Sequence, residues 1–248
     1  MNNHSPRLAA YTLPELLVCI GILGVLAGLV LSGVAQVRHR ARRTVCANQL
    51  KQLGSATAMY QADHEDRHPP TFALGANGLD QTNWFHYTFE YHGSDRILRC
   101  PVPPGQGPFD RRPPLSGRYA ANFRLGGCQW PGTSWNVPSL AFSSVLNPSG
   151  TVHLTDSGTV PTPTSDPAQC VRPDSVRKTT AWILDDPMRP TPCEGCVTAD
   201  FDPNWGGPDP RHGLRSNNTF VDGHVQAQPS RDWYWAGSAW LDPMAVGR

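Results

Sequence analysis

An uninterrupted apolar run near the N-terminus constrains this chain more than any other feature. Residues 16–37, LLVCIGILGVLAGLVLSGVAQV, contain no charged side chain. As an α-helix, these 22 residues would span roughly 30 Å at about 1.5 Å each, which is the thickness of a bilayer core. The run therefore predicts a transmembrane helix, and disfavours a buried core helix or the shorter apolar region of a secretory signal.

The helical pattern continues beyond the apolar run. Five residues spaced three or four positions apart share one predicted helical face: Cys46, Leu50, Leu53, Thr57 and Tyr60. Gly54 is the weak point of this stretch, because glycine disfavours a helix. The polar residues 63–67 and Pro69-Pro70 then end the pattern. We therefore predict one helix from about Leu13 to Ala62, with its second half lying on a domain.

A carboxylate, Glu15, lies at the edge of the apolar run, where a charge is costly. Either the dipole at the helix N-terminus stabilises it or a dedicated counter-charge pairs with it. Its segment, AYTLPELL over residues 10–17, resembles the processing and methylation site of type IV pilins and type II secretion pseudopilins. The resemblance implies that a leader is cut between Ala10 and Tyr11 and that Tyr11 becomes N-methylated. It also implies that Glu15 neutralises the N-terminal amine of a neighbouring subunit during assembly. Two residues depart from the usual pattern: Ala10 replaces Gly, and Pro14 replaces an aliphatic residue.

Further motifs resemble a large bacterial subgroup of the same proteins. They are, in chain order, Arg42–Gly54, Leu98–Pro101, Tyr119–Asn122, and Ser144–Pro148 leading to Asp156. Near the end, nine residues separate His212 from Asp222-Gly223. This pattern resembles the prepilin-associated domain named for its His, nine-residue gap and Asp-Gly, whose role the sequence does not indicate.

The C-terminal motif also has a simpler interpretation. Asp222-Gly223 lies between short apolar-containing segments, which predicts a β-hairpin with a type I′ turn. A metal or catalytic site that includes His212, Asp222 and His224 is the alternative. The acidic segment 200–209 could hold calcium through oxygen ligands, although the spacing of a calcium loop is absent. No other cofactor is expected.

Seven cysteines are present, and Cys19 within the apolar run is expected to remain a thiol. An even number in a loop-rich exported domain predicts disulfides, with 15 ways of pairing six residues. The six candidates are Cys46, Cys100, Cys128, Cys170, Cys193 and Cys196. We specifically predict a Cys46–Cys100 bridge that ties the helix to the domain, with two buried thiols as the alternative. Cys193-Glu-Gly-Cys196 could instead be half of a zinc site or a redox pair.

The expected architecture is an α+β, pilin-like fold. A long N-terminal helix packs on a small antiparallel β-sheet with long Pro-rich loops, because the 25 Pro and 23 Gly favour strands and turns. The expected parts are a leader (1–10), a transmembrane helix (11–37), the amphipathic second half of that helix (38–68) and a globular extracytoplasmic domain (69–248).

The resemblance implies a structural subunit, major or minor, of a type IV pilus or a type II secretion pseudopilus. Such a protein is anchored by a single pass in the bacterial inner membrane. Its partners would be itself, other pilins or pseudopilins, the prepilin peptidase, the inner-membrane assembly platform and the lipid bilayer. A net charge of +1 gives no reason to expect nucleic acid.

The alternative function is a membrane-anchored, extracytoplasmic metal-binding or hydrolytic protein that does not assemble into filaments. Common catalytic motifs such as Gly-x-Ser-x-Gly, His-Glu-x-x-His and the phosphate loop are missing from the sequence, so no enzyme and no catalytic residue is expected. One feature opposes an extracytoplasmic domain: Arg38, Arg40, Arg42 and Arg43 follow the apolar run, whereas only Arg7 precedes it. The resemblance and the cysteines outweigh that asymmetry.

Overall fold

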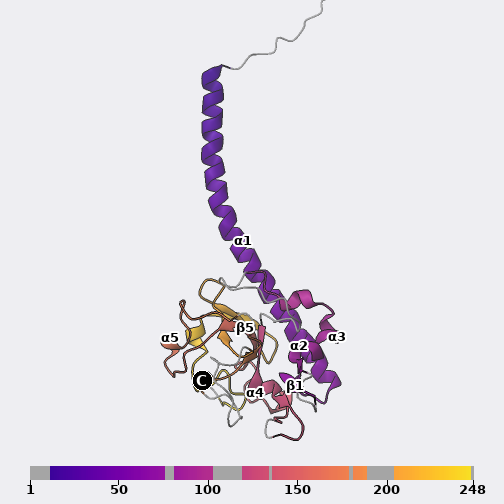
Figure 1. Ribbon diagram of the computed structural model, residues 1–248. Helices are drawn as coiled ribbons and strands as arrows, with labels where there is room; N and C mark the ends of the chain where they lie inside the picture. The colour runs from indigo at the N-terminus through magenta and orange to yellow at the C-terminus, as the bar shows by residue number, and fades with distance from the viewer. Residues whose placement is uncertain are drawn as a thin grey trace, which may run out of the picture. The chain divides into compact units, whose positions relative to one another are not determined.

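The computed structural model describes residues 12–75, 81–102, 119–133, 136–178, 181–188 and 204–246. The chain divides into two compact units, residues 1–41 and residues 42–248. Figure 1 shows the ribbon, in which one long helix precedes short helices and strands. The fold is α+β, as the sequence predicts.

The long helix α1 (Leu13–Asp63) has nearly the predicted bounds. At its start, the Thr12 backbone N–H and hydroxyl both donate to a Glu15 carboxylate oxygen at 2.8 Å, so Glu15 satisfies the backbone donor of the residue just before the helix. At its end, the chain enters the left-handed region at Glu65 (φ 53°) and Asp66 (φ 64°). The Asp66 N–H then donates to the Gln61 carbonyl at 2.9 Å and closes the last turn.

In the part of the chain that the structure describes, no helix is long and apolar enough to cross a membrane. This finding contrasts with the transmembrane helix expected over residues 11–37.

Two sheets form the β-structure of the second unit. The larger has the order β6-β3-β5-β8-β9, with β7 also paired to β5; the smaller has the order β2-β1-β4. The strands of the larger sheet are β3 (Tyr119–Asn122), β5 (Val152–Thr159), β6 (Ile183–Leu184), β7 (Gly207–Pro208), β8 (Ser216–Phe220) and β9 (Val225–Gln228). Those of the smaller sheet are β1 (Phe72–Leu74), β2 (Gln81–Asn83) and β4 (Cys128–Gln129).

The sheets are mixed, not purely antiparallel as expected. β3 pairs parallel to β6, and β1 pairs parallel to β4, whereas the other pairings are antiparallel. Every residue of β5 is buried, because β3, β7 and β8 all pair with it. β5 is therefore the central strand of the unit.

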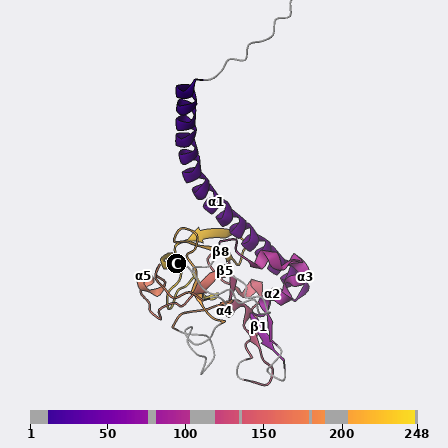
Figure 2. The ribbon, with the colours of Figure 1, turned by 45° about the horizontal axis from the view of Figure 1, so that its top comes forward.

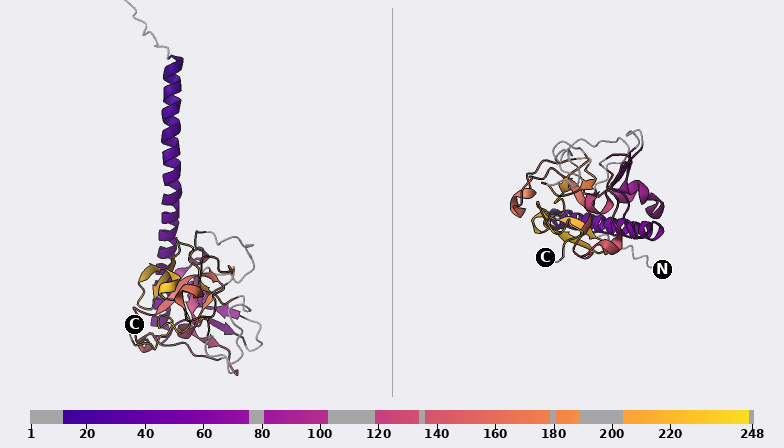
Figure 3. Two further views of the ribbon diagram at one scale, coloured as in Figure 1. Left: turned by 90° about the vertical axis from the view of Figure 1, so that its left-hand side faces the viewer. Right: turned by 90° about the horizontal axis from the view of Figure 1, so that it is seen from below.

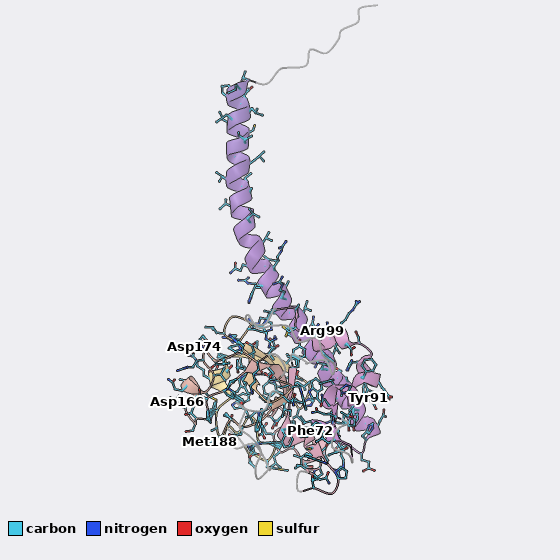
Figure 4. The ribbon with its side chains drawn as sticks, viewed as in Figure 1. Phe72, Tyr91, Arg99, Asp166, Asp174 and Met188 are labelled. Atoms are coloured by element: carbon cyan, nitrogen blue, oxygen red, sulfur yellow. The ribbon has the colours of Figure 1, made fainter. Side chains whose placement is uncertain are left out.

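Short helices connect these strands. The α-helices are α2 (Trp84–Tyr87), α3 (Phe89–His92), α4 (Phe123–Gly126) and α5 (Pro167–Cys170), and the 3₁₀ helices are η1 (Asp95–Leu98), η2 (Phe142–Ser144) and η3 (Ser230–Asp232). Figure 4 labels Tyr91 on α3, whose hydroxyl donates to the carboxylate of Asp63 at the end of α1 at 2.9 Å. This contact and the aromatic contacts of Tyr60 join α3 to α1.

The second half of α1 packs on the larger sheet. Cys46, Leu50 and Leu53 are fully buried and share a core cluster with residues of β3 and β5, as the predicted helical face requires. Thr219 of β8 donates its hydroxyl to the Leu50 carbonyl at 3.2 Å, and Figures 2 and 3 show the strands beside this part of α1. Gly54 avoids a steric clash here, since a Cβ at this position would lie 2.8 Å from the Thr219 methyl group. The predicted weak point of the helix is therefore a position where it approaches the sheet closely.

The predicted hairpin is present as β8 and β9, but its turn is not type I′. Gly223 has a positive φ of 83°, whereas Asp222 does not share this conformation, and the Gly223 N–H donates to the Phe220 carbonyl at 2.9 Å. The turn thus needs only one left-handed residue, as in longer hairpin loops. The Gly223 carbonyl accepts a hydrogen bond from Lys51 of α1 at 2.7 Å, so the Asp-Gly motif also fastens the helix to the hairpin.

Candidate functional site

Four side chains with metal-binding or nucleophilic chemistry meet in the interior of the second unit. Cys46, Cys100, Asp156 and His212 are 0–3% exposed, and one ligand atom from each lies within 4.8 Å of the other three. Among the described residues, no other three or more His, Cys, Asp or Glu side chains come together in this way. These residues, called the buried cluster below, are the candidate functional site.

Each member of the cluster comes from a different part of the fold. Cys46 lies on the inner face of α1, and Asp156 lies in β5 opposite Tyr119 of β3. Cys100 follows η1 and is buried, whereas its neighbour Arg99 is exposed (Figure 4). His212 lies in the tight turn before β8, where its N–H donates to the Arg215 carbonyl at 3.1 Å.

The contacts within the cluster converge on Asp156 and His212. The Cys46 thiol donates to Asp156 Oδ1 at 3.0 Å, and His212 Nε2 lies 3.2 Å from Asp156 Oδ2. Cys100 Sγ lies 3.5 Å from the same His212 Nε2. Around them, the Tyr119 hydroxyl lies 3.2 Å from Cys46 Sγ, and the Asn217 N–H donates to Asp156 Oδ2 at 2.8 Å.

The surroundings of the cluster are strongly polar for a protein interior. Arg211, next to His212 in the chain, has a side chain that is only 4% exposed and pairs with Asp209 at 3.0 Å, and Arg177 contacts the same carboxylate. Ions buried in a protein core need such pairing to offset the loss of water. The cluster is thus an interior region in which charges of both signs are held.

The contacts perturb the pKa values of the cluster. The hydrogen bond with Cys46, helped by that with His212, lowers the pKa of Cys100 to about 5. Burial, followed by the contacts with Cys100 and Asp156, raises the pKa of Cys46 far above its usual range. Although burial opposes it, the hydrogen bonds with Asp156 and Cys100 raise the pKa of His212 to about 9. The lowered pKa of Cys100 and the raised pKa of His212 have one cause in common, which is the contact between these two side chains.

The geometry does not match a nucleophile–base–carboxylate relay. In such a relay, the histidine faces the nucleophile with one ring nitrogen and the carboxylate with the other. Here His212 uses Nε2 for both contacts, and its Nδ1 is buried without a hydrogen-bond partner. One ligand atom from each of the four residues instead lies within 4.8 Å of the others, which is an arrangement suited to holding a cation.

The predicted disulfide between Cys46 and Cys100 is not formed. Neither cysteine is in a disulfide, nor are Cys128 and Cys170, while Cys193 and Cys196 lie outside the described residues. The Cys46 thiol donates to Asp156 and the Cys100 thiol lies beside His212, so each sulfur has a polar partner in the cluster. Cys170 packs in a separate apolar cluster. Cys19 is an exposed thiol.

The other residues singled out by the sequence lie elsewhere. Asp222 and His224 contact each other at 2.6 Å on the hairpin surface, whereas His212 is buried with Asp156. Asp209 of the acidic segment 200–209 is buried between two arginines, and residues 200–203 lie outside the described part. The processing-site residues Ala10 and Tyr11 are also outside it.

Glu15, the expected assembly residue, is exposed in the first turn of α1. Hydrogen bonds from the backbone and the hydroxyl of Thr12 lower its pKa, so the side chain is a carboxylate at neutral pH. It can therefore act as a counter-charge to a cation.

From the sequence, only Cys46 and Cys100 were predicted to meet, as a disulfide, whereas Asp156 and His212 were not linked to them or to each other. Cys46, Cys100, Asp156 and His212 each belong to one of the successive motifs quoted for the resemblance. The sequence feature that could have indicated the cluster is the chemistry of its side chains, since two cysteines, a carboxylate and an imidazole are all common metal ligands. No sequence pattern predicted the charged residues around the cluster, above all Arg211.

One family model matches the chain, over residues 35–91: it is described as a protein of unknown function, DUF1559. No curated protein matches, and no solved structure matches. The matched region contains the second half of α1 and Cys46, but not the other three members of the buried cluster.

Proposed function

We propose that this chain is a structural subunit of a type IV pilus or a type II secretion pseudopilus, with residues 42–248 as its extracytoplasmic domain. In this proposal a prepilin peptidase removes residues 1–10 and the amine of Tyr11 is methylated. The match to DUF1559 supports the more general part of this proposal, namely that the chain is a pilin-like extracytoplasmic protein.

The observation that carries the proposal is the apolar surface of the first part of α1. Eleven large apolar side chains between Leu13 and Leu31 are each 52–76% exposed. A surface of this kind on a folded chain marks an interaction site, because water does not favour so much contiguous apolar area. They are Leu13, Leu16, Leu17, Val18, Ile20, Ile22, Leu23, Val25, Leu26, Leu29 and Leu31.

The partner that fits this surface is the same helix of other subunits. The apolar side chains point to all sides of α1, as expected for a helix surrounded by other helices. Gly21, Gly24 and Gly28 have open space around the position of a Cβ, which allows a neighbouring backbone to approach closely. Bundled N-terminal helices would thus cover the apolar area.

Glu15 supplies the electrostatic part of the proposed assembly. Its carboxylate lies at the start of this apolar surface and is charged at neutral pH. In a bundle it would be enclosed by apolar side chains and would need a cation, and the terminal amine of the next subunit meets that need. The proposed contact therefore sets the register between neighbouring subunits.

The test is the substitution Glu15→Ala in cells that carry a prepilin peptidase and an assembly platform. Loss of one partner of a buried ion pair costs about 3 kcal/mol or more, which corresponds to more than a hundredfold per contact. We expect normal cellular levels of the variant but its loss from sheared filament fractions. Glu90→Ala, an exposed carboxylate on α3, is the matched control and should assemble normally. Equal amounts of Glu15→Ala and wild type in filaments would contradict the proposal.

A further inference from the structure

We propose that Cys46, Cys100, Asp156 and His212 bind one Zn²⁺ ion in a closed, structural site. The inference is independent of filament assembly, because it concerns only the interior of residues 42–248. It assigns a ligand class to the buried cluster and a role to two thiols that are not joined in a disulfide.

The spacing of the donor atoms agrees with four ligands around one zinc ion. Zinc binds sulfur at about 2.3 Å and nitrogen or oxygen at about 2.0–2.1 Å, usually in a tetrahedron. Ligand atoms in such a tetrahedron lie about 3.3–3.8 Å apart. In the cluster, Cys46 Sγ lies 3.0 Å from Asp156 Oδ1, His212 Nε2 lies 3.2 Å from Asp156 Oδ2, and Cys100 Sγ lies 3.5 Å from His212 Nε2. One ligand atom from each of the four residues lies within 4.8 Å of the others. Shifts of up to about 1 Å would bring all four atoms to these separations.

The identity of the donors selects zinc over other common ions. Calcium and magnesium require oxygen ligands, and two thiols exclude a site of that kind. Two cysteine sulfurs with an imidazole nitrogen and a carboxylate oxygen form a set typical of zinc. Because all four protein ligands are buried, the ion would keep no open position for water or substrate. The site is therefore structural and not catalytic.

The charges around the cluster also favour a dication. A zinc ligand cysteine is a thiolate, so the bound state holds negative charges on Cys46, Cys100 and Asp156, with a fourth on the adjacent Asp209. Arg177 and Arg211, both in contact with Asp209, supply two positive charges. A Zn²⁺ ion supplies the other two and makes the buried region neutral, which a low-dielectric interior requires.

Neighbouring groups hold two of the ligands in place. The Tyr119 hydroxyl contacts Cys46 Sγ, and the Asn217 N–H donates to the Asp156 oxygen that faces His212. Such second-layer hydrogen bonds orient ligands and tune metal sites. The ion would join α1, the segment after η1, β5 and the turn before β8, which are segments far apart in the sequence. It would thereby fix the helix to the sheet.

The proposal is tested on the purified full chain, with the metal content measured by mass spectrometry after dialysis against buffer with a thiol reductant. We expect about one zinc per chain for wild type and less than about a tenth for Cys46→Ala and His212→Ala. Cys128→Ala, which removes a buried thiol outside the cluster, is the matched control and should keep its zinc.

A second measurement keeps the test valid if a variant fails to fold. Wild-type protein stripped with a chelator and refilled with Co²⁺ should show tetrahedral d–d bands and a thiolate-to-cobalt charge-transfer band. Three results would overturn the proposal: folded wild type without zinc and without these cobalt bands, a Cys46–Cys100 disulfide in protein isolated without reductant, or equal zinc loss in Cys128→Ala.

Discussion

The contact between Gly54 of α1 and Thr219 of β8 provides a direct test of how the helix packs on the sheet. A Cβ built on Gly54 lies 2.8 Å from the Thr219 methyl carbon, whereas ordinary contacts begin at 3.4 Å. The methyl group cannot easily rotate away, because the Thr219 hydroxyl donates to the Leu50 carbonyl at 3.2 Å. The substitution Gly54→Ala must therefore push α1 from the sheet or break that hydrogen bond.

Two opposing contributions determine how much Gly54→Ala changes the unfolding free energy. An alanine in place of glycine within a helix gains about 1 kcal/mol of helix propensity, while overpacking a tight contact costs about 1–3 kcal/mol. We expect Gly54→Ala to be neutral or destabilising by up to about 2 kcal/mol, which lowers the melting temperature by up to roughly 8 °C for a chain of this size. Gly28→Ala is the matched control, since nothing lies within 4 Å of its Cβ position. It should not lower the melting temperature.

A double-mutant cycle separates the steric contact from other effects. Thr219→Ser removes the methyl group but keeps the hydroxyl that donates to Leu50, so Gly54→Ala in this background should regain about 1–3 kcal/mol of unfolding free energy. The assay is urea unfolding of the four proteins followed by circular dichroism. If Gly54→Ala has the same effect in the wild-type background and in the Thr219→Ser background, the proposed packing of α1 on β8 is incorrect.

Three further predictions concern buried charge. Burial holds the pKa of His68 at about 4, below its unfolded value of 6.5. Between pH 4 and pH 6.5 the unfolded chain therefore binds more protons than the folded chain. The contribution of neutral His68 to the unfolding free energy is complete above pH 6.5 and is lost as pH falls toward 4. Urea unfolding should show that the unfolding free energy falls by about 2 kcal/mol between pH 7 and pH 5 because of His68. This fall should be smaller in His68→Gln but unchanged in His39→Gln, the control at an exposed site. Arg124→Met removes the guanidinium from the buried carboxylates of Asp185 and Asp186 and should cost about 3–5 kcal/mol, measured in the same way. Removal of bound zinc by a chelator should lower the melting temperature of wild type but leave that of His212→Ala unchanged.

Local patterns predicted the elements that depend on neighbouring residues. The three- and four-residue spacing from Cys46 to Tyr60 located the buried face of α1, and the polar run before Pro69-Pro70 located its end. Asp222-Gly223 located the hairpin, although the turn type was wrong because only Gly223 adopts a positive φ. These features depend on interactions between residues close together in the chain, so they can be predicted from a single sequence.

Features that depend on long-range contacts were predicted incompletely. Cys46 meets Asp156 across 110 positions and Cys100 meets His212 across 112, and no local pattern encodes such pairings. The predicted link between Cys46 and Cys100 did bring the correct two residues together, but as thiols, because Asp156 and His212 provide polar partners for the sulfurs. The parallel pairings of β3 with β6 and β1 with β4 likewise required the folded chain.

The measurement that tests the proposed function most directly is the intact mass and N-terminal sequence of the chain from cells with an active prepilin peptidase. The proposed function predicts a mature protein that begins at Tyr11 and carries one methyl group on its amine, with loss of the ten residues from Met1 to Ala10. The same chain from cells without the peptidase should retain those residues. A full-length, unmethylated N-terminus in both kinds of cell would contradict assembly as a pilin-like subunit.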